Sequence, residues 1–282
     1  MARFDPAVED LIGLALREDI GAGDITTGNI VDSEMLGRGE VIAKEAAVIC
    51  GLAVARRVFE RLGDGTPIEW RPRVADGDSV AAGDTVLTVD GPLDLLLIGE
   101  RTALNFLQRL SGVATQTRRY TGALGSDGPR IVDTRKTTPG WRSLEKYAVR
   151  TGGGHNHRMG LYDGVLIKDN HIAVSGGIEA AVAKVRARIS HLVKIEVEAA
   201  DMDEVKAALD AGADIIMLDN MDRPRIEAAV AEINGRALVE VSGGVTLESL
   251  TDLAASGVDL ISIGALTHSA RAVDLSMRIE GP

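Results

Sequence analysis

Short apolar runs and amphipathic segments alternate along the second half of the chain. The apolar runs begin near residues 130, 164, 192, 213, 237 and 258. The segments between them carry apolar residues at helical spacing, and in residues 176–189 these are Ile178, Val182, Val185 and Ile189. Continuous apolar strands that alternate with helices indicate a parallel sheet with both faces covered. A complete barrel of such units has eight of them. Because six are visible, we predict a shortened, open TIM-like α/β barrel.

The first part of the chain follows a different pattern. Apolar residues at helical spacing after Asp5-Pro6 predict a helix near the start. From about residue 25 to 91, short β-type runs are separated by Gly- and Asp-rich turns and interrupted by a helix at 53–62. Residues 95–120 predict a long helix that joins the two parts. We therefore expect a β-rich domain over 1–109 and the barrel domain over 110–282.

One stretch of the β-rich part allows a second interpretation. Residues 74–91 resemble the hairpins of biotin- or lipoate-carrier domains. Such a carrier needs an exposed lysine at the hairpin tip, and this stretch contains none. A purely structural domain is therefore favoured.

The composition narrows the classes of function. Aromatic residues make up 3% of the chain, and its net charge is -11 with a pI near 5.0. These values argue against nucleic-acid binding, which uses aromatic platforms and basic surfaces. The chain has a single cysteine, Cys50, and no apolar run long enough to span a membrane. We expect a cytoplasmic protein with no membrane partner, in which Cys50 is a buried apolar residue.

Charged residues, a hydroxyl or glycines follow each apolar run of the second half. In parallel α/β barrels, the loops after the strands build the active site. Six convergent strand ends of this kind indicate a ligand site rather than a solvated rim. The residues at these positions are Arg135, Lys136, Lys168, Glu196, Glu198, Asp219, Asn220, Ser242, Gly243, Gly244 and Gly264.

Positive charge gathers in one part of this acidic chain. Residues 133–172 hold seven Lys or Arg and four Asp or Glu, a net charge of +3, so the remainder carries -14. Lys168 follows an apolar run directly, and a lysine buried there requires an anionic partner. That partner is either a ligand anion or a protein carboxylate.

The later strand ends have a different chemistry. Ser242-Gly243-Gly244 and Ile263-Gly264-Ala265 each precede a predicted helix, where backbone N–H groups and the helix end favour a phosphate. Glu198 and Asp219 lie between these glycines and the cations, and carboxylate oxygens suit Mg2+ or sugar hydroxyls. The alternative is that the two carboxylates simply pair with Lys168 and Arg135.

His155-Asn156-His157 follows three consecutive glycines. Two histidines two residues apart could share a zinc or iron ion with carboxylates from the strand ends. The glycines favour another interpretation, in which a flexible loop lays His157 and Arg158 over the pocket as hydrogen-bond donors.

Several ordered motifs resemble the quinolinate phosphoribosyltransferase family. They are ERTALN at 100–105, TRKTTPG at 134–140, NHR with GL, D and LIKDNH at 156–171, EVE at 196–198, MLDN at 217–220 and SGG at 242–244. The likeness runs from about Glu18 to the C-terminus, although Trp141 stands where a smaller apolar residue is expected. It implies an N-terminal α/β sandwich, a shortened barrel and a homodimer in which each active site is completed by the partner subunit.

The resemblance also implies the reaction and its residues. Quinolinate and phosphoribosyl pyrophosphate would give nicotinate mononucleotide, pyrophosphate and CO2 for de novo NAD biosynthesis, with Mg2+ required. The catalytic residues would be Lys136, Lys168, Glu198 and Asp219. Glu198 and Asp219 would bind ribose hydroxyls and the metal. The residues implied to bind substrate are Arg101 from the neighbouring subunit, Thr134, Arg135, Lys136, His157, Arg158, Lys168, Glu198, Asp219, Ser242, Gly243, Gly244, Ile263, Gly264 and Ala265.

The sequence leaves two alternative enzyme functions to consider. One is a related enzyme that acts with molybdenum-transport genes; the complete set of Arg135, Arg158 and Lys168 favours quinolinate instead. The other is a Schiff-base aldolase barrel with Lys168 as its nucleophile, which requires an isolated lysine in a mostly apolar pocket.

Overall fold

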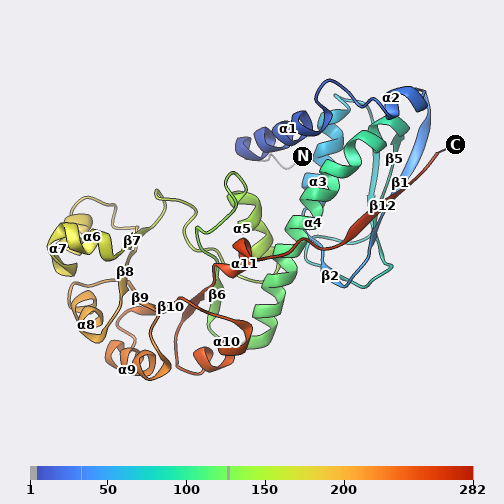
Figure 1. Cartoon of the computed structure of the whole chain (residues 1–282). Helices are drawn as coiled ribbons and strands as arrows, with labels where there is room; N and C mark the ends of the chain where they lie inside the picture. Colours follow the sequence, from blue (N-terminus) through green and yellow to red (C-terminus); the bar gives the residue numbers. More distant parts are fainter. Residues whose placement is uncertain (1–4, 33, 126–127, 282) are drawn as a thin grey trace. The chain divides into compact units, whose positions relative to one another are not determined.

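A computed structural model describes residues 5–32, 34–125 and 128–281. The chain divides into two compact units (Figure 1). The first contains the residues up to 118 together with 137–153 and those from 266 onward, and the second contains 119–136 and 154–265. The chain therefore returns to the first unit at residues 137–153 and again from residue 266 onward. Among the described residues, no helix is both long and apolar enough to cross a membrane.

The first unit is a layer of helices on an antiparallel sheet, which confirms the predicted α/β sandwich. The sheet has the order β12-β1-β5-β3, and α1, α3 and the first part of α4 lie along one side of it (Figure 1). The strands and helices that lie wholly or mainly in this unit are α1 (Pro6–Ile20), α2 (Thr27–Ile30), β1 (Leu36–Ala43), β2 (Ala47–Val48), α3 (Leu52–Leu62), β3 (Glu69–Pro72), β4 (Ser79–Val80), β5 (Thr85–Pro92), α4 (Leu93–Leu124), α5 (Arg142–Thr151), α11 (Ala265–His268) and β12 (Leu275–Glu280).

Aromatic and apolar residues hold the helices of the first unit to its sheet. Phe59 on α3 is fully buried, and its ring centre lies 6.1 Å from that of Trp70 on β3. A Cβ atom at Gly99 on α4 would lie 2.6 Å from the Phe59 ring, so α3 and α4 approach too closely for a larger residue there. Trp141, unexpected from the family pattern, stacks on Phe106 of α4 with ring centres 4.8 Å apart.

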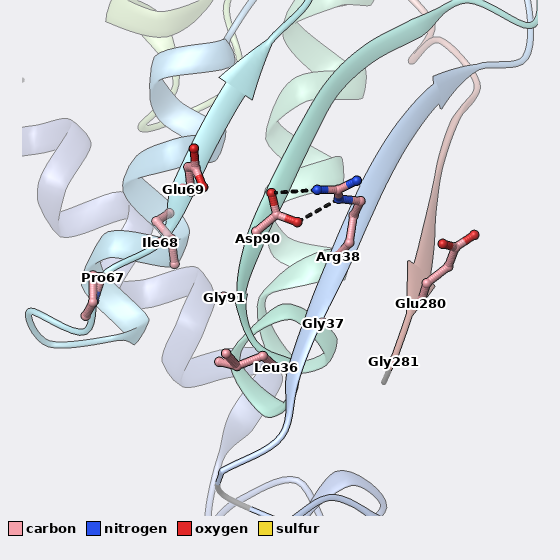
Figure 2. Close-up of a pocket in the computed structure, with 10 residues that line it drawn as sticks. All are labelled: Leu36, Gly37, Arg38, Pro67, Ile68, Glu69, Asp90, Gly91, Glu280 and Gly281. Atoms are coloured by element: carbon pink, nitrogen blue, oxygen red, sulfur yellow. Dashed lines mark hydrogen bonds and ion pairs between the residues drawn. The ribbon is translucent and has the colours of Figure 1, made fainter.

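The C-terminal strand β12 was not predicted from the sequence. It pairs with β1, and Met277 lies opposite Val41 in the antiparallel register. A cleft of about 760 Å³ opens near this part of the sheet, and Figure 2 shows Arg38 reaching Asp90 at its wall. None of the site residues implied by the sequence lines this cleft.

The second unit is the open parallel barrel that the sequence predicts. Its six strands have the order β6-β11-β10-β9-β8-β7, and every pairing is parallel. Figure 1 shows the helices outside the curved sheet. The elements are β6 (Arg130–Val132), β7 (Val165–Ile167), α6 (Asp169–Ser175), α7 (Ile178–Arg186), β8 (Ile195–Ala199), α8 (Met202–Asp210), β9 (Ile215–Asp219), α9 (Arg223–Ile233), β10 (Leu238–Ser242), α10 (Leu247–Ala254) and β11 (Leu260–Ser262).

Alternation along the strands decides which residues reach the barrel interior. On β8, Val197 is fully buried, while Glu196 and Glu198 point to the opposite face of the sheet from it. On β10, Val239 and Val241 likewise alternate with Glu240 and Ser242. Side chains of alternate strand residues fill the interior of such barrels. Carboxylates at these positions are therefore brought together by the fold.

Candidate active site

An ion pair joins the carboxyl ends of the strands β7 and β8. Lys168 follows β7 and Glu198 lies near the end of β8, and the register of Ile167 against Val197 brings the next residues side by side. The Lys168 ammonium group contacts the Glu198 carboxylate, with the side chains 44% and 15% exposed. In this structure, the anionic partner expected for Lys168 is thus a protein carboxylate at the mouth of the barrel. The pair is accessible to an anion that approaches from solvent.

Two arginines form the neighbouring part of the site. Burial, followed by the charge of Arg135, lowers the pKa of Arg158, whereas Glu196 and Asp163 act in the opposite direction. The Arg158 guanidinium also donates to the Gly164 carbonyl over 3.0 Å. The charge of Arg135 thus disfavours the charged form of the partly buried Arg158. A bound dianion would relieve that repulsion.

The loop that carries Arg158 is held along β6 rather than being free, which corrects the flexible loop expected from its glycines. His155 pairs with Val132 as a parallel bridge, and its N–H donates to the Ile131 carbonyl over 2.8 Å. The fully buried Asp133 accepts hydrogen bonds from the Asn156 side chain over 2.6 Å and from the His157 backbone over 2.9 Å. These bonds fix the backbone that leads into Arg158.

The His157 ring points into the barrel. Its Nε2 lies 2.9 Å from a Glu196 carboxylate oxygen and 3.8 Å from one of Glu240, while its Nδ1 accepts the Arg158 N–H over 2.8 Å. These three side chains form the one cluster of three or more His, Cys, Asp or Glu residues that could hold a metal among the described residues, and His155 is not part of it. The metal shared by His155 and His157 is therefore not supported.

Sequence reasoning missed Glu240. Its side chain is 1% exposed, and burial and the charge of Glu196 raise its pKa to about 7, against smaller opposing effects of His157 and Ser262. The signal was present, because a glutamate interrupts the apolar run of β10. A charged residue inside a buried strand requires a specific partner.

Asp219 and the serine–glycine turn lie side by side. Ser242 is aligned with Asp219 in the register of β10 and β9, and the Asn220 side chain donates to Asp219 over 2.9 Å. Gly243 has φ 100°, and a Cβ atom there would lie 2.1 Å from Asn220 Oδ1. Only glycine fits that backbone and that contact. The turn after β10 thus packs against the turn after β9.

The remaining strand ends complete the same rim. The Ile263 N–H donates to the Val132 carbonyl over 3.0 Å, which ties the loop at Gly264 and Ala265 to β6. After β6, the Lys136 N–H donates to the Thr134 hydroxyl over 3.0 Å in a tight turn that displays Arg135 and Lys136 to solvent. Both ends belong to the second unit.

Arg101 belongs to the first compact unit. It is on α4 in the first unit, and its side chain is 57% exposed, with Glu100 as a distant ionic neighbour at 3.8 Å. The implied site residues of the second unit thus stand at the ends of its neighbouring strands, whereas Arg101 belongs to the first unit.

Glu198 and Asp219 fit the requirements of Mg2+ as a donor set. The ion prefers carboxylate oxygens and usually keeps the remaining positions for water and substrate phosphates. The two carboxylates lie on the neighbouring strands β8 and β9, near their carboxyl ends. Both side chains are only partly buried.

Models of both domains of one family match the chain. The quinolinate phosphoribosyl transferase N-terminal domain matches residues 24–111, and the C-terminal domain of the same family matches residues 113–278. A Bacillus subtilis (strain 168) protein named probable nicotinate-nucleotide pyrophosphorylase (carboxylating) is 44% identical, over 93% of this chain and 90% of its own length. A chloroplastic nicotinate-nucleotide pyrophosphorylase (carboxylating) of Arabidopsis thaliana is 41% identical, over 96% of this chain and 82% of its own.

A solved structure agrees over the whole chain. The crystal structure of NadC from Streptococcus pyogenes superposes with a TM-score of 0.94 and 41% sequence identity, covering 100% of both chains. The barrel fold and the cations at its strand ends are those of an α/β-barrel enzyme that acts on anionic substrates. The chain belongs to the quinolinate phosphoribosyl transferase family.

Proposed function

We propose that this chain transfers the phosphoribosyl group of phosphoribosyl pyrophosphate to quinolinate and removes one carboxylate. The products are nicotinate mononucleotide, pyrophosphate and CO2, in de novo NAD biosynthesis. The relatives named as carboxylating nicotinate-nucleotide pyrophosphorylases support the reaction. The observation that carries the proposal is the ion pair of Lys168 and Glu198 at the carboxyl ends of β7 and β8, which offers a cation and a carboxylate side by side.

The charges of the substrates explain why the site needs these cations. Quinolinate carries two carboxylates, and the phosphoribosyl donor carries several phosphate charges. Bringing such anions together out of water requires fixed positive groups. Arg135, Arg158 and Lys168 take the quinolinate carboxylates in this proposal. Thr134 and Lys136, which share a turn, bind substrate beside them, and Lys136 contacts quinolinate or the pyrophosphate.

Lys168 would exchange partners when quinolinate binds. In the structure, Lys168 contacts Glu198. A quinolinate carboxylate that takes over Lys168 frees Glu198 for the ribose hydroxyls and for Mg2+. The ion pair is also unlike the isolated, apolar surroundings that a Schiff-base lysine requires, which argues against the aldolase alternative.

Glu198 and Asp219 would hold Mg2+ in this proposal, and the ion would neutralise charge on the pyrophosphate as it leaves. The turns at Ser242, Gly243 and Gly244 and at Ile263, Gly264 and Ala265 bind the 5′-phosphate, because exposed backbone N–H groups suit a phosphate. A direct contact of His157 with quinolinate stays a prediction, since both ring nitrogens bond within the protein here.

The chemistry follows from positioning and charge. Departure of pyrophosphate leaves an oxocarbenium-like ribose, which the pyridine nitrogen attacks to form the new C–N bond. The ring nitrogen then carries a positive charge, and the bond to the neighbouring carboxylate breaks with its electrons held in the ring. A proton from water replaces the CO2. A dedicated general base is not needed, so preorganised charge supplies most of the catalysis.

We further propose that the enzyme is a homodimer in which Arg101 reaches the active site of the partner subunit. The exposed position of Arg101 on the first unit supports this arrangement. The cytoplasmic location expected from composition stays a prediction.

The test of the proposed function is an assay of the purified chain with phosphoribosyl pyrophosphate and Mg2+. We expect nicotinate mononucleotide to form with quinolinate and not with nicotinate, which lacks the second carboxylate. Equal turnover of nicotinate, or no turnover of quinolinate, would contradict the proposal.

A further inference from the structure

A buried carboxylate holds the end of the loop that follows β6. Glu145 lies in the first turn of α5 and is fully buried. Its Oε2 accepts a hydrogen bond from the Thr138 N–H over 3.0 Å, and its Oε1 accepts one from the Thr138 hydroxyl over 2.9 Å. A carboxylate so far from water requires such donors. Both donors of the exposed Thr138 are therefore held by one side chain of the interior.

Arg109 on α4 supplies the balancing positive charge. Its Nε and Nη2 atoms donate to Glu145 Oε1 over 3.2 and 2.8 Å. The same guanidinium donates to the carbonyl of Thr267 over 2.6 Å and to that of Ala270. A planar guanidinium group can serve several acceptors in a fixed geometry. Glu145 keeps its orientation because its ionic partner is itself held in place.

A tight turn connects Thr138 to α5. The Trp141 N–H donates to the Thr138 carbonyl over 3.0 Å, with Pro139 and Gly140 at the central positions and φ 81° at Gly140. Proline followed by a glycine of positive φ is the pattern of a type II turn. The Trp141 carbonyl accepts the Glu145 N–H over 2.9 Å, which starts the helix. Thr138 is thus linked to Glu145 through the backbone as well as through the carboxylate.

The loop end held by Glu145 lies next to residues with a role in the proposed reaction. Only one residue separates Thr138 from Lys136. At the other end of the same turn, the Asp133 N–H donates to the His155 carbonyl over 3.1 Å. The exposed Arg135 lies between these two points. The backbone that carries Arg135 and Lys136 is therefore fixed on both sides.

We propose that Glu145 is a positioning residue for quinolinate binding. Paired with Arg109, it anchors Thr138 and so fixes the turn that presents Arg135 and Lys136. Glu145 touches no substrate and acts only through this turn. The inference rests on the proposed function, in which Arg135 takes a quinolinate carboxylate. Groups that are ordered before the ligand arrives do not have to be ordered when it binds, which favours affinity.

A purely structural ion pair is the competing explanation. Removing one partner of a buried pair is destabilising in general, so a loss of stability does not separate the two explanations. The kinetics do separate them. An anchor of this turn affects the KM for quinolinate more than the KM for phosphoribosyl pyrophosphate, whereas a general loss of order affects both.

The segment after the 5′-phosphate turn has bonds to α4 that do not involve Glu145. This segment starts directly after Ala265. Its Val273 N–H donates to the Gln108 carbonyl over 3.1 Å, and the Gln108 side chain donates to the Leu275 carbonyl over 2.8 Å. Because these bonds remain when Glu145 is changed, we expect binding of the phosphoribosyl donor to be little affected.

Glu145→Gln and Thr138→Val test the anchor. Glutamine keeps the shape of the side chain, but its amide group opposes one donor of Thr138 and leaves Arg109 without a counter-charge. We expect the KM for quinolinate to rise about tenfold, as for one lost charge-assisted hydrogen bond, with kcat and the KM for phosphoribosyl pyrophosphate changed by less than about threefold. Thr138→Val removes only the hydroxyl, and the KM for quinolinate should rise about threefold. The matched control is Thr66→Val, an exposed threonine just after α3, which should leave both KM values unchanged.

Trp141 reports on the turn without any turnover. Its ring stacks on Phe106 with ring centres 4.8 Å apart, and Trp70 is the other tryptophan of the chain. In a Trp70→Phe background, tryptophan emission therefore comes from Trp141 alone. We expect a red shift and stronger quenching by acrylamide in Glu145→Gln, and no change in Thr66→Val.

The proposal is overturned if both variants keep the wild-type KM for quinolinate, if the two KM values rise equally, or if the Trp141 emission of Glu145→Gln is unchanged. Should Glu145→Gln fail to fold, Thr138→Val decides alone, because it changes an exposed residue by one atom. A protein whose Trp141 signal responds as expected but which does not use quinolinate would disprove the proposed function and leave the anchored turn standing.

Discussion

Individual residues of the site divide into those that sequence reasoning could find and those that it could not. Lys168, Glu198 and Asp219 follow apolar runs, and a strand-end position is readable from the pattern. Glu240 was missed because it lies within its strand, where its role depends on Glu196 and His157 from distant parts of the chain. The partner of Lys168 was left open for the same reason. Contacts between strands that are far apart in sequence need the folded register.

Replacing a cation of the rim should abolish turnover without unfolding the protein. For Lys168→Ala and Arg135→Ala, we expect quinolinate turnover to fall by about a thousandfold or more, since each removes a positive group aimed at developing or bound charge. Lys168 is 44% exposed, so the free energy of unfolding should change by about 1 kcal/mol or less.

Steady-state kinetics and urea unfolding check this prediction. Lys184→Ala is a control, because that lysine is exposed on the outer helices and donates a hydrogen bond to the Ser175 carbonyl. Near-normal kinetics for Lys168→Ala would argue against the assignment of the rim.

Glu240 should make stability depend on pH. Its pKa is raised in the folded protein, from 4.5 to about 7, so the folded state binds more protons than the unfolded state between these values. Stability from this group is present at low pH and is lost as pH rises through about 7. Relative to wild type, Glu240→Gln should gain roughly 3 kcal/mol between pH 4.5 and pH 8.

Denaturant unfolding of the two proteins across that pH range measures the gain. Parallel stability curves would mean that folding does not raise the pKa of Glu240, which would contradict this prediction.

At the scale of elements, local sequence patterns were sufficient to predict the barrel. They were not sufficient to predict the strand pairing in the sheet of the first unit. Each barrel strand is a continuous apolar run beside its own amphipathic helix, so the pattern is local. The strand β12 (Leu275–Glu280) pairs with β1, more than two hundred residues earlier in the chain. No local pattern in the sequence identifies a pairing strand that is so distant along the chain. The loop at Thr138 is likewise held by the buried Glu145, which α5 supplies and which also pairs with Arg109.

The packed turns after β9 and β10 should be sensitive to a single methyl group. Gly243→Ala places a Cβ atom 2.1 Å from Asn220 Oδ1 in a backbone with φ 100°. We expect a loss of about 1–3 kcal/mol in stability and a raised KM for phosphoribosyl pyrophosphate. Gly235→Ala is the matched control, since its φ is also positive at 74° but nothing lies within 4 Å of the added atom. Equal effects of the two changes would show that the contact with Asn220 is unimportant.

At the scale of the whole molecule, the pattern of the sequence indicated two domains and their architectures, and the family models match both parts of the chain. The assembly of subunits is not readable from periodicity. It rests on the implied role of Arg101, whose side chain is exposed on the first unit. The proposed homodimer therefore needs a test that joins residues of two chains.

Mixed dimers provide that test. Arg101→Ala and Lys168→Ala should each be inactive alone, because each damages every active site of its own homodimer. After subunit exchange, a hybrid contains one site with both residues intact, and activity should return to about a quarter of wild type for a statistical mixture. Native mass spectrometry confirms the exchange. If hybrids form and no activity returns, the shared site is wrong.

The most direct test of the central claim is a crystal structure of the enzyme with quinolinate and a non-reactive analogue of phosphoribosyl pyrophosphate with Mg2+. The account predicts that Arg135, Arg158 and Lys168 contact the two carboxylates of quinolinate, and that Lys168 has left Glu198. A complex in which these cations point away from the pyridine diacid, with Lys168 still bound to Glu198, would contradict it.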